Sequence, residues 1–209
     1  MSRPANYVAP PLWSVTREWA GERCFVLCSG ESLGPQRPLI AKLRGRFIAV
    51  KHGVLARPNA DILFLSGERN VEIAAELIPK YQGPRIVVRG RGDVELPASV
   101  LRVTRSKDHE HLSELRDPAH VGGYDAGTSA LHLAHLLGAA EIVMLGYDQA
   151  GGHFVQHPLQ YPPLDHFRRH MAPLAGLARD ATQKGVRIVN CSPTSAVTAF
   201  ECRPLEEFL

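Results

Sequence analysis

Two histidines and an aspartate, close together in the sequence, have side chains suited to proton transfer. Asp148 follows an apolar run in "MLGYD", and His153 and His157 lie just downstream in "GGHFVQHP". A histidine on a loop has a pKa near neutrality and can take a proton from an attacking hydroxyl. The carboxylate could accept a bond from a ribose or substrate hydroxyl, hold a metal ion or cap a turn. We expect no metal site, because the glycines and proline of this segment disfavour the helix that two histidines four residues apart would need.

A second candidate site is the turn in "VLCSGESLGP", residues 26 to 35. Gly30 lets the backbone turn tightly, and Ser29 and Ser32 can cap the following helix or donate to a phosphate. The stretch contains neither the spaced glycines of a dinucleotide-binding fingerprint nor the ending of a P-loop. On spacing alone, an ordinary turn between a strand and a helix is the simpler interpretation.

Two further segments could contribute donors to the same crevice. Gly127, Thr128 and Ser129 open a helix whose amides and hydroxyls could cradle an anion or simply cap the helix. Asn190 and Ser192 follow another apolar run in "VNCSPTSAV", where binding and turn capping are again the two interpretations.

These segments require a scaffold that brings strand ends together. Short apolar runs bounded by Gly, Pro, Asn or charged residues predict strands at 24–28, 47–50, 61–66, 85–88, 100–104, 141–146 and 186–190. Helical periodicity predicts helices at 71–81, 129–137 and 164–183. Strands that alternate with helices predict an α/β, Rossmann-like fold with a mostly parallel sheet and helices on both faces. We expect one domain over residues 21–209, an extended arm over residues 1–20, and a loop or lid over 105–126.

Composition narrows the functional class. The 209 residues carry a net charge of +3, which permits an anionic ligand without requiring one. The four cysteines are too few for a disulfide scaffold, and Cys24 and Cys28 on a strand would both face the same side. No signal peptide or long apolar span is visible, so we expect a cytoplasmic protein with no membrane partner.

The ordered set "VLCSGESL", "GTSALHLAHLLGAAEIVMLGYD", "HFVQHP" and "IVNCSPTSAVTAF" resembles a known group. It is similar to a phage and prophage family related to the archaeal 6-hydroxymethylpterin diphosphokinase domain, and more distantly to Rossmann-like bacterial sialyltransferases. The similarity covers residues 22 to 209. A phage origin would place the protein in the host cytoplasm.

The resemblance to sialyltransferases implies roles for particular residues. It implies that Ser29, Gly30, Ser32, Thr128 and Ser129 hold the phosphate and ribose of a nucleotide-sugar. It also implies that the second histidine of the His-aromatic-x-x-His segment, which is His157, is the catalytic base.

The sequence also departs from those relatives. Ser29 stands where they have an asparagine, and Glu31 adds a negative charge near the supposed phosphate site. Lys51 replaces another asparagine at the end of the second strand, and its charge could pair with a phosphate. Gln149 and Ala150 stand where sialyltransferases have tyrosines, which argues against sialic acid as the transferred group.

Three functions follow from these features. The first is a nucleotide- or nucleotide-sugar-dependent transferase that moves a group to an acceptor hydroxyl. The second is pyrophosphoryl transfer from ATP, which would use Mg²⁺ held by carboxylates among Glu31, Asp125 and Asp148. The third is a phage nucleotide-binding or accessory protein without catalysis. The first two have a nucleotide-containing small molecule as their partner, whereas in the third the crevice would be occupied loosely or not at all; the sequence leaves the oligomeric state open.

A DNA acceptor is a further prediction, and it depends on one basic region. DNA binding would require the cations of this region to share one face of the protein. They are Arg85, Arg89, Arg91, Arg102, Arg105 and Lys107. A solvated basic surface is the alternative.

Overall fold

The structure is a computed structural model that describes residues 10–66, 70–90, 97, 99–150, 152–155 and 164–209. These residues form one sheet of nine strands, and every neighbouring pair is parallel. The strand order is β6-β5-β4-β3-β2-β1-β7-β8-β9. The strands are β1 (Arg23–Leu27), β2 (Arg46–Val50), β3 (Ile62–Ser66), β4 (Arg85–Arg89), β5 (Leu101–Arg105), β6 (His120–Val121), β7 (Glu141–Leu145), β8 (Arg187–Asn190) and β9 (Glu201–Cys202).

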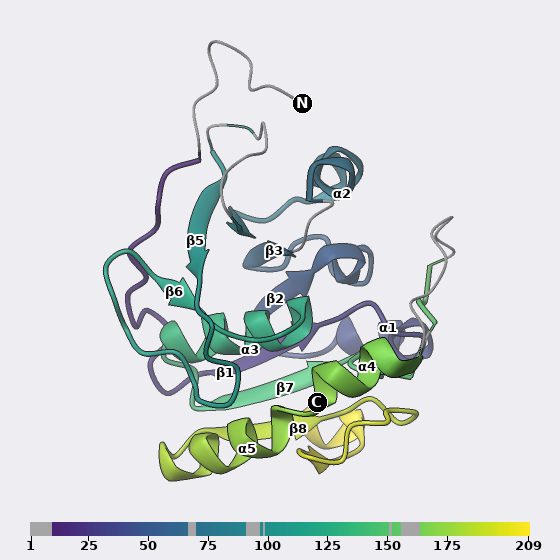
Figure 1. The fold of residues 1–209 in the computed structure, drawn as a ribbon. Helices are drawn as coiled ribbons and strands as arrows, with labels where there is room; N and C mark the ends of the chain where they lie inside the picture. Colours follow the sequence, from purple (N-terminus) through teal and green to yellow (C-terminus); the bar gives the residue numbers. More distant parts are fainter. Residues whose placement is uncertain (1–9, 67–69, 91–96, 98, 151, 156–163) are drawn as a thin grey trace.

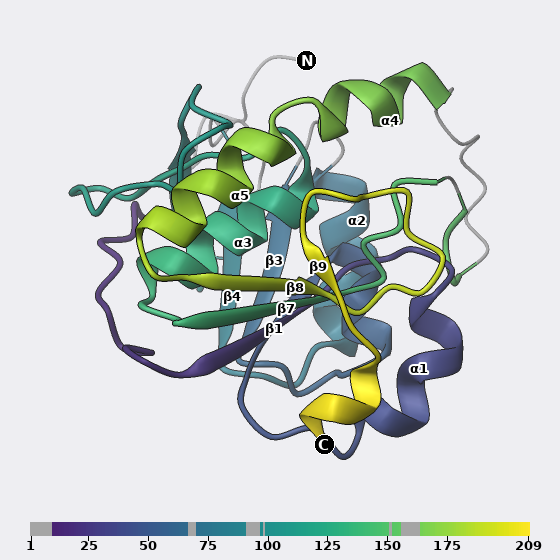
Figure 2. The same cartoon turned by 90° about the horizontal axis from the view of Figure 1, so that it is seen from below.

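Helices cover both faces of this sheet, as Figures 1 and 2 show. One face packs against α3 (Ala126–Leu136) and α5 (Leu174–Gln183), and α4 (Leu164–Met171) precedes α5. The other face packs against α1 (Leu33–Ile40), α2 (Asn70–Leu77) and the 3-10 turns η1 (Lys51–Leu55) and η3 (Leu205–Phe208). A further 3-10 turn, η2 (Ile78–Lys80), follows α2.

The alternation of side chains along β1 creates the two cores. Cys24, Val26 and Cys28 lie in the core beneath α3, and Phe25 and Leu27 lie in the core beneath α1 and α2. Every one of these side chains is buried, because a strand covered on both faces buries both sets of alternating residues. The expectation that the two cysteines face the same side is confirmed.

The α/β Rossmann-like fold and its seven predicted strands are confirmed, and no strand boundary differs from the predicted one by more than one residue. The two-residue edge strands β6 and β9 were not predicted, because such short pairings leave no periodic signal. The predicted helix over 164–183 is wrong in one respect. Pro173 separates α4 from α5, since its ring cannot continue a helix begun upstream. Pro79 similarly replaces the end of the predicted helix over 71–81 with a 3-10 turn.

Residues 10 to 20 run along the sheet before β1. Leu12 forms an isolated bridge with Arg102 of β5, and Val15 and Trp19 are buried in the core beneath α3. Across the described residues, no helix combines the length and apolar character that a membrane span requires.

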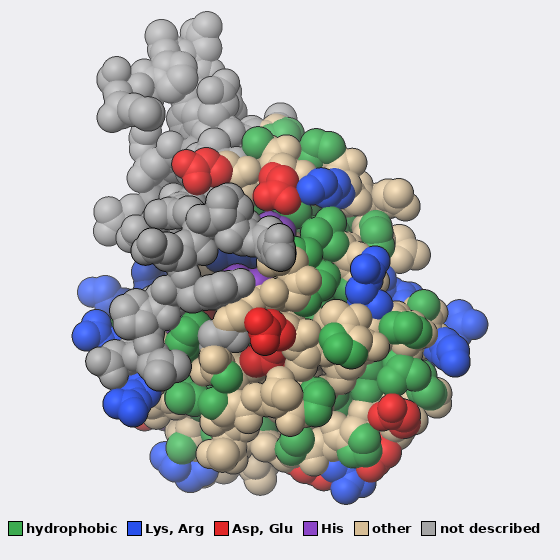
Figure 3. All heavy atoms as spheres, turned by 90° about the vertical axis from the view of Figure 1, so that its right-hand side faces the viewer, with side chains coloured by type: hydrophobic (Ala, Val, Ile, Leu, Met, Phe, Trp, Pro, Cys, Tyr) green, Lys and Arg blue, Asp and Glu red, His purple; other side chains and the backbone are tan. Residues whose placement is uncertain are grey.

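The strand order places a topological switch point between β1 and β7. From β1 the chain builds the sheet outward through β2 to β6, and it then returns to place β7 on the other side of β1. The segments that follow β1 and β7 therefore lead to helices on opposite faces of the sheet, and open α/β sheets bind their ligands at the carboxyl ends of such strands. Figure 3 views this side: histidine side chains lie near its centre, and Lys and Arg side chains are spread around its rim.

Candidate functional site

The turn after β1 is held by hydrogen bonds to the loop after β7. The Gly30 N–H donates to the Gly146 carbonyl at 2.8 Å. A Cβ at position 30 would lie 2.4 Å from Asp148 Oδ2 and 2.6 Å from the Gly146 carbonyl oxygen. Glycine is therefore required here because the two loops approach each other closely.

Asp148, which follows the neighbouring strand β7, stabilises this turn. Its side chain is 4% exposed, and its Oδ2 accepts a bond of 2.9 Å from the Ser32 N–H while Oδ1 accepts from the Ser32 hydroxyl. The Ser29 hydroxyl donates to the Val50 carbonyl at 3.2 Å. A buried carboxylate must be satisfied by donors, and Ser32 supplies two of them.

The end of β8 completes the same set of bonds. The Ser192 Oγ accepts from the Tyr147 N–H at 2.8 Å, and the Ser192 N–H donates to Asn190 Oδ1 at 3.1 Å. The Asn190 amide in turn donates to Ser195 Oγ at 2.9 Å. We call the residues that share these bonds the turn network: Ser29, Gly30, Ser32, Asp148, Asn190, Ser192 and Ser195.

The start of α3 is closed by the protein's own carboxylate. Asp125 is the N-cap residue, its Oδ1 accepts from the Thr128 N–H at 3.0 Å, and its own N–H donates to Thr128 Oγ1 at 3.2 Å. The Ser129 hydroxyl donates to the Asp125 carbonyl. A Cβ at Gly127 would lie 2.8 Å from the Tyr147 ring. In this structure, the amide and hydroxyls expected to cradle an anion therefore serve as a capping box.

A charged cluster surrounds Asp125. The Tyr147 hydroxyl donates to Asp125 Oδ2 at 2.8 Å, and the Gln149 Nε2 donates to the same oxygen at 3.3 Å. Lys51 and Arg89 both interact electrostatically with Asp125. We use the name charged cluster for Lys51, Arg89, Asp125, Tyr147 and Gln149.

Two members of the charged cluster have strained backbones. Lys51 and Gln149 each have a φ of +50°, and among the described residues they alone combine a positive φ with a side chain. They follow β2 and β7, the strands on either side of β1. Left-handed conformations of this kind carry an energetic cost in non-glycine residues and often occur at ligand sites.

The two cations of the charged cluster are desolvated. Burial lowers the pKa of Lys51, Asp125 opposes this shift and Arg89 adds to it. Burial, with a contribution from Arg105, lowers the pKa of Arg89 to about 10. Arg89 Nε donates to Ser66 Oγ at 3.1 Å, and Nη1 donates to the Gly122 and Gly123 carbonyls at 2.7 Å. Neither Lys51 nor Arg89 forms an ion pair within the described part of the chain, so an added anion would be attracted to both.

The loop after β7 that contains His153 lies against the turn network. His153 is exposed, and its Nδ1 donates to the Ser29 carbonyl at 3.0 Å, beside the bond from the Phe154 N–H to the same oxygen. This bond places the proton on Nδ1 and leaves Nε2 as the basic nitrogen of the neutral ring. His157 lies outside the described residues, so its assignment as the base stays a prediction.

The structure brings most of the predicted site residues to the carboxyl ends of the strands. They differ in their surroundings, because some belong to the turn network and others to the charged cluster or the cap of α3. Lys51 is the charged residue among the predicted binding residues, and it forms no ion pair with any residue that the structure describes. From the sequence, Asp125 and Arg89 are candidates only for Mg²⁺ and DNA, and the contacts of Tyr147 and Gln149 with Asp125 are not predicted. The feature of the sequence that could have indicated these residues is that each lies at or just after the end of a strand. In the parts of the chain that are described, no three or more His, Cys, Asp or Glu side chains are grouped to hold a metal.

Several described residues of the basic region proposed for DNA are buried or engaged within the protein. Arg85 and Arg89 lie at opposite ends of β4, and Arg89 is buried. Arg85 pairs with Glu18, and Arg102 donates to the Pro10 carbonyl. Arg91 lies outside the described residues. The described contacts give no support to a DNA acceptor.

Comparison with solved structures identifies glycosyltransferases of the same fold. The MAf glycosyltransferase from Magnetospirillum magneticum matches 97% of this chain with a TM-score of 0.65 and 12% identity. This chain spans about a third, 36%, of that protein's length. The Campylobacter jejuni sialyltransferase CstII, solved with the substrate analogue CMP-3FNeuAc, matches 88% of this chain and 86% of its own, with a TM-score of 0.51 and 11% identity.

A CstII structure in complex with CMP matches 87% of this chain with a TM-score of 0.51 and 11% identity. No protein-family model matches the sequence, and comparison with curated protein sequences finds no match. At these identities the structural likeness establishes the shared fold.

Proposed function

We propose that this protein is a nucleotide- or nucleotide-sugar-dependent transferase of the glycosyltransferase type, which moves a group to an acceptor hydroxyl. The observation that carries the proposal is the charged cluster, where Lys51 and Arg89 are desolvated, interact electrostatically with Asp125 and form no ion pair among the described residues. Desolvation penalises the charged form of a cation, and the phosphate of a nucleotide would offset that penalty. The fold shared with CstII, which has been solved with CMP, supports a nucleotide at this edge.

The residues suggest a division of labour in the reaction. A histidine of the loop after β7 takes the proton of the acceptor hydroxyl as its oxygen attacks the transferred group. The bond from that group to the nucleotide phosphate breaks, and its electron pair leaves with the phosphate. Lys51 and Arg89 stabilise the negative charge of the departing nucleotide. His157 is the predicted base, and His153 is a second candidate because its Nδ1 bond to Ser29 fixes the tautomer that leaves Nε2 basic.

Calorimetric titration tests the nucleotide site. CMP, a UDP-sugar, ATP and GTP are titrated into the wild-type protein and into Lys51→Met. We expect one class of nucleotide to bind and the variant to bind it about 10- to 100-fold more weakly, the value of one charge-assisted hydrogen bond. Lys42→Met, at an exposed lysine after α1, is the matched control and should bind normally. Silence across the whole panel would instead favour a protein without catalysis.

Turnover of the bound nucleotide-sugar tests the base. His157→Ala should lower turnover by about 10²–10⁴-fold, the usual contribution of a general base, and leave donor binding intact. His153→Ala is measured in parallel, and His120→Ala on β6 is the control. Wild-type turnover in both loop variants would refute a histidine base in this loop. An absolute requirement for Mg²⁺ with ATP as donor would point to pyrophosphoryl transfer.

A further inference from the structure

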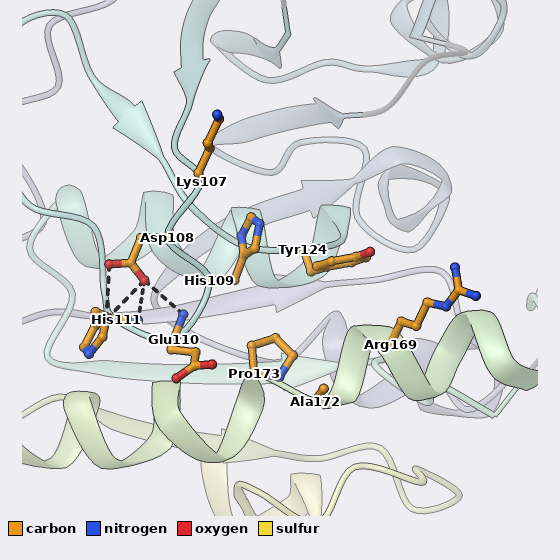
Figure 4. Close-up of a pocket in the computed structure, with 9 residues that line it drawn as sticks. All are labelled: Lys107, Asp108, His109, Glu110, His111, Tyr124, Arg169, Ala172 and Pro173. Atoms are coloured by element: carbon orange, nitrogen blue, oxygen red, sulfur yellow. Dashed lines mark hydrogen bonds and ion pairs between the residues drawn. The ribbon is translucent and has the colours of Figure 1, made fainter.

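A pocket of about 440 Å³ contains His109, on which Arg89 of the charged cluster acts electrostatically. The pocket is built from the segment after β5, the residue before Asp125, helix α4 and the turn between α4 and α5, as Figure 4 shows. Its lining residues are Lys107, Asp108, His109, Glu110, His111, Tyr124, Arg169, Ala172 and Pro173.

Arg89 connects this pocket to the charged cluster. Its guanidinium donates to the carbonyls of Gly122 and Gly123, which immediately precede Tyr124 and Asp125. Tyr124 therefore lines the pocket while its neighbour Asp125 belongs to the charged cluster. A ligand in the pocket would lie next to a nucleotide held by Lys51 and Arg89.

The pocket exposes part of an aromatic side chain. Tyr124 is 39% exposed, although its ring contacts the rings of His109 and His170 at centroid distances of 5.3 and 5.1 Å. Burial, together with Arg105 and Arg89, lowers the pKa of His109, so its imidazole is neutral at pH 7 and can exchange a hydrogen bond with a hydroxyl. A partly exposed aromatic side chain beside a neutral imidazole suits a ring that has both apolar C–H groups and hydroxyl groups.

The charged side chains that line the pocket differ in their contacts with the rest of the protein. The Asp108 carboxylate accepts from the His111 ring and from the Glu110 and His111 N–H groups, all at 3.1 Å. The Glu110 side chain lies against Gly176 of α5, where an added Cβ would be 3.1 Å from its Oε2. Arg169 of α4 has no ion-pair partner within the described residues. In Figure 4 the Tyr124 hydroxyl points toward the side of the pocket formed by Arg169.

We propose that this pocket is the acceptor subsite and that it takes a saccharide ring carrying an anionic group. The ring lies on the face of Tyr124, its hydroxyls reach His109, and the anionic group pairs with Arg169. The role as acceptor rests on the proposed transferase function, whereas binding of the ring does not.

Saturation-transfer NMR on the full chain tests this without activity. The probes are methyl glucuronide and methyl glucoside, two rings that differ by one carboxylate. We expect the glucuronide to receive saturation and to bind about tenfold more tightly than the glucoside. Tyr124→Ala should abolish the signal of both probes, and Tyr124→Phe should retain it because the ring face remains.

Arginine variants separate the anionic contact from the ring contact. Arg169→Ala should bring glucuronide affinity down to that of the glucoside, whereas Arg179→Ala, at an exposed arginine of α5, should change nothing. No saturation of either probe, or an unchanged signal in folded Tyr124→Ala, would overturn the subsite. Equal affinities for the two probes in the wild type would overturn the anionic preference.

The outcome is independent of the nucleotide titration. Ring binding without any nucleotide binding would retain the saccharide pocket and remove its role as acceptor subsite. Nucleotide binding without ring binding would retain the proposed transferase and overturn the pocket.

Discussion

Asp148 and Lys51 follow the two strands that flank β1, and their charges differ in whether the protein supplies a partner for them. The carboxylate of Asp148 is buried with two donors from Ser32, so its charge is used inside the protein. The ammonium of Lys51 is desolvated on a strained backbone without an ion-pair partner in the described residues.

This difference teaches that position at the switch point does not by itself identify a binding residue. The turn network pairs its own polar groups, whereas Lys51 and Arg89 of the charged cluster form no ion pair among the described residues. We therefore expect substitutions in the turn network to change stability and those in the charged cluster to change affinity.

The largest effect is expected at Asp148. Asp148→Ala leaves the buried Ser32 N–H and hydroxyl without their acceptor, which should lower the free energy of unfolding by about 2–4 kcal/mol. Urea denaturation measures the loss. Asp148→Asn keeps the shape and one acceptor oxygen, so it should cost less. If Asp148→Ala unfolds at the wild-type urea concentration but loses nucleotide affinity, the turn network is a binding surface and the comparison is wrong.

Lowering the pH should reduce the free energy of unfolding, because a buried histidine beside the charged cluster would have to take up a proton. His132 is fully buried beneath Gly122, its Nδ1 accepts from the Ser113 N–H at 3.1 Å, and burial first, then Arg89, lower its pKa from 6.5 to about 3. A lowered pKa in the folded state means that stability is complete above pH 6.5 and is lost as the pH falls from 6.5 toward 3.

The expected slope is about 1.4 kcal/mol per pH unit from this one group. Burial also lowers the pKa of the half-buried His135, to about 4, so it contributes in the same direction. Urea denaturation at pH 7.5, 6.5 and 5.5 measures the slope. His132→Gln cannot titrate and should make the slope shallower; an unchanged slope would show that His132 is not the group responsible.

A smaller effect on stability is expected at Lys51. Lys51→Met removes a desolvated charge and keeps most of the side-chain volume, so the free energy of unfolding should stay the same or rise by about 1 kcal/mol. Thermal and urea unfolding without ligand measure this, beside the affinity loss given above. A loss of stability as large as that of Asp148→Ala would place Lys51 among structural residues.

The smallest effect is expected at Gln149. Gln149→Gly relieves a left-handed backbone at the cost of a 3.3 Å bond to Asp125, and the two contributions, each of about 1 kcal/mol, should nearly cancel. Unfolding should therefore be near wild type while nucleotide affinity falls. Unchanged affinity would remove Gln149 from the charged cluster's function.

Much of the scaffold could be predicted from local sequence. Runs such as "CFVLC" and "EIVML" are apolar without interruption because strands covered on both faces bury every side chain, and this pattern is visible without any partner. The alternation of such runs with helical periodicity determined the parallel sheet. The glycine and serines of "CSGES" also indicated a tight turn, as the bond from Gly30 to Gly146 requires.

Only the tertiary structure decided which polar residues are left for a ligand. Ser32 and Asp148 are separated by 116 positions, and their bond removes both from the set of free polar groups. Arg89 was one arginine among several in the sequence, and its burial beside Lys51 depends on β4, β2 and the loop before α3 meeting at one edge. Periodicity reports burial along a single segment, whereas the partner of a charge depends on segments that meet in space.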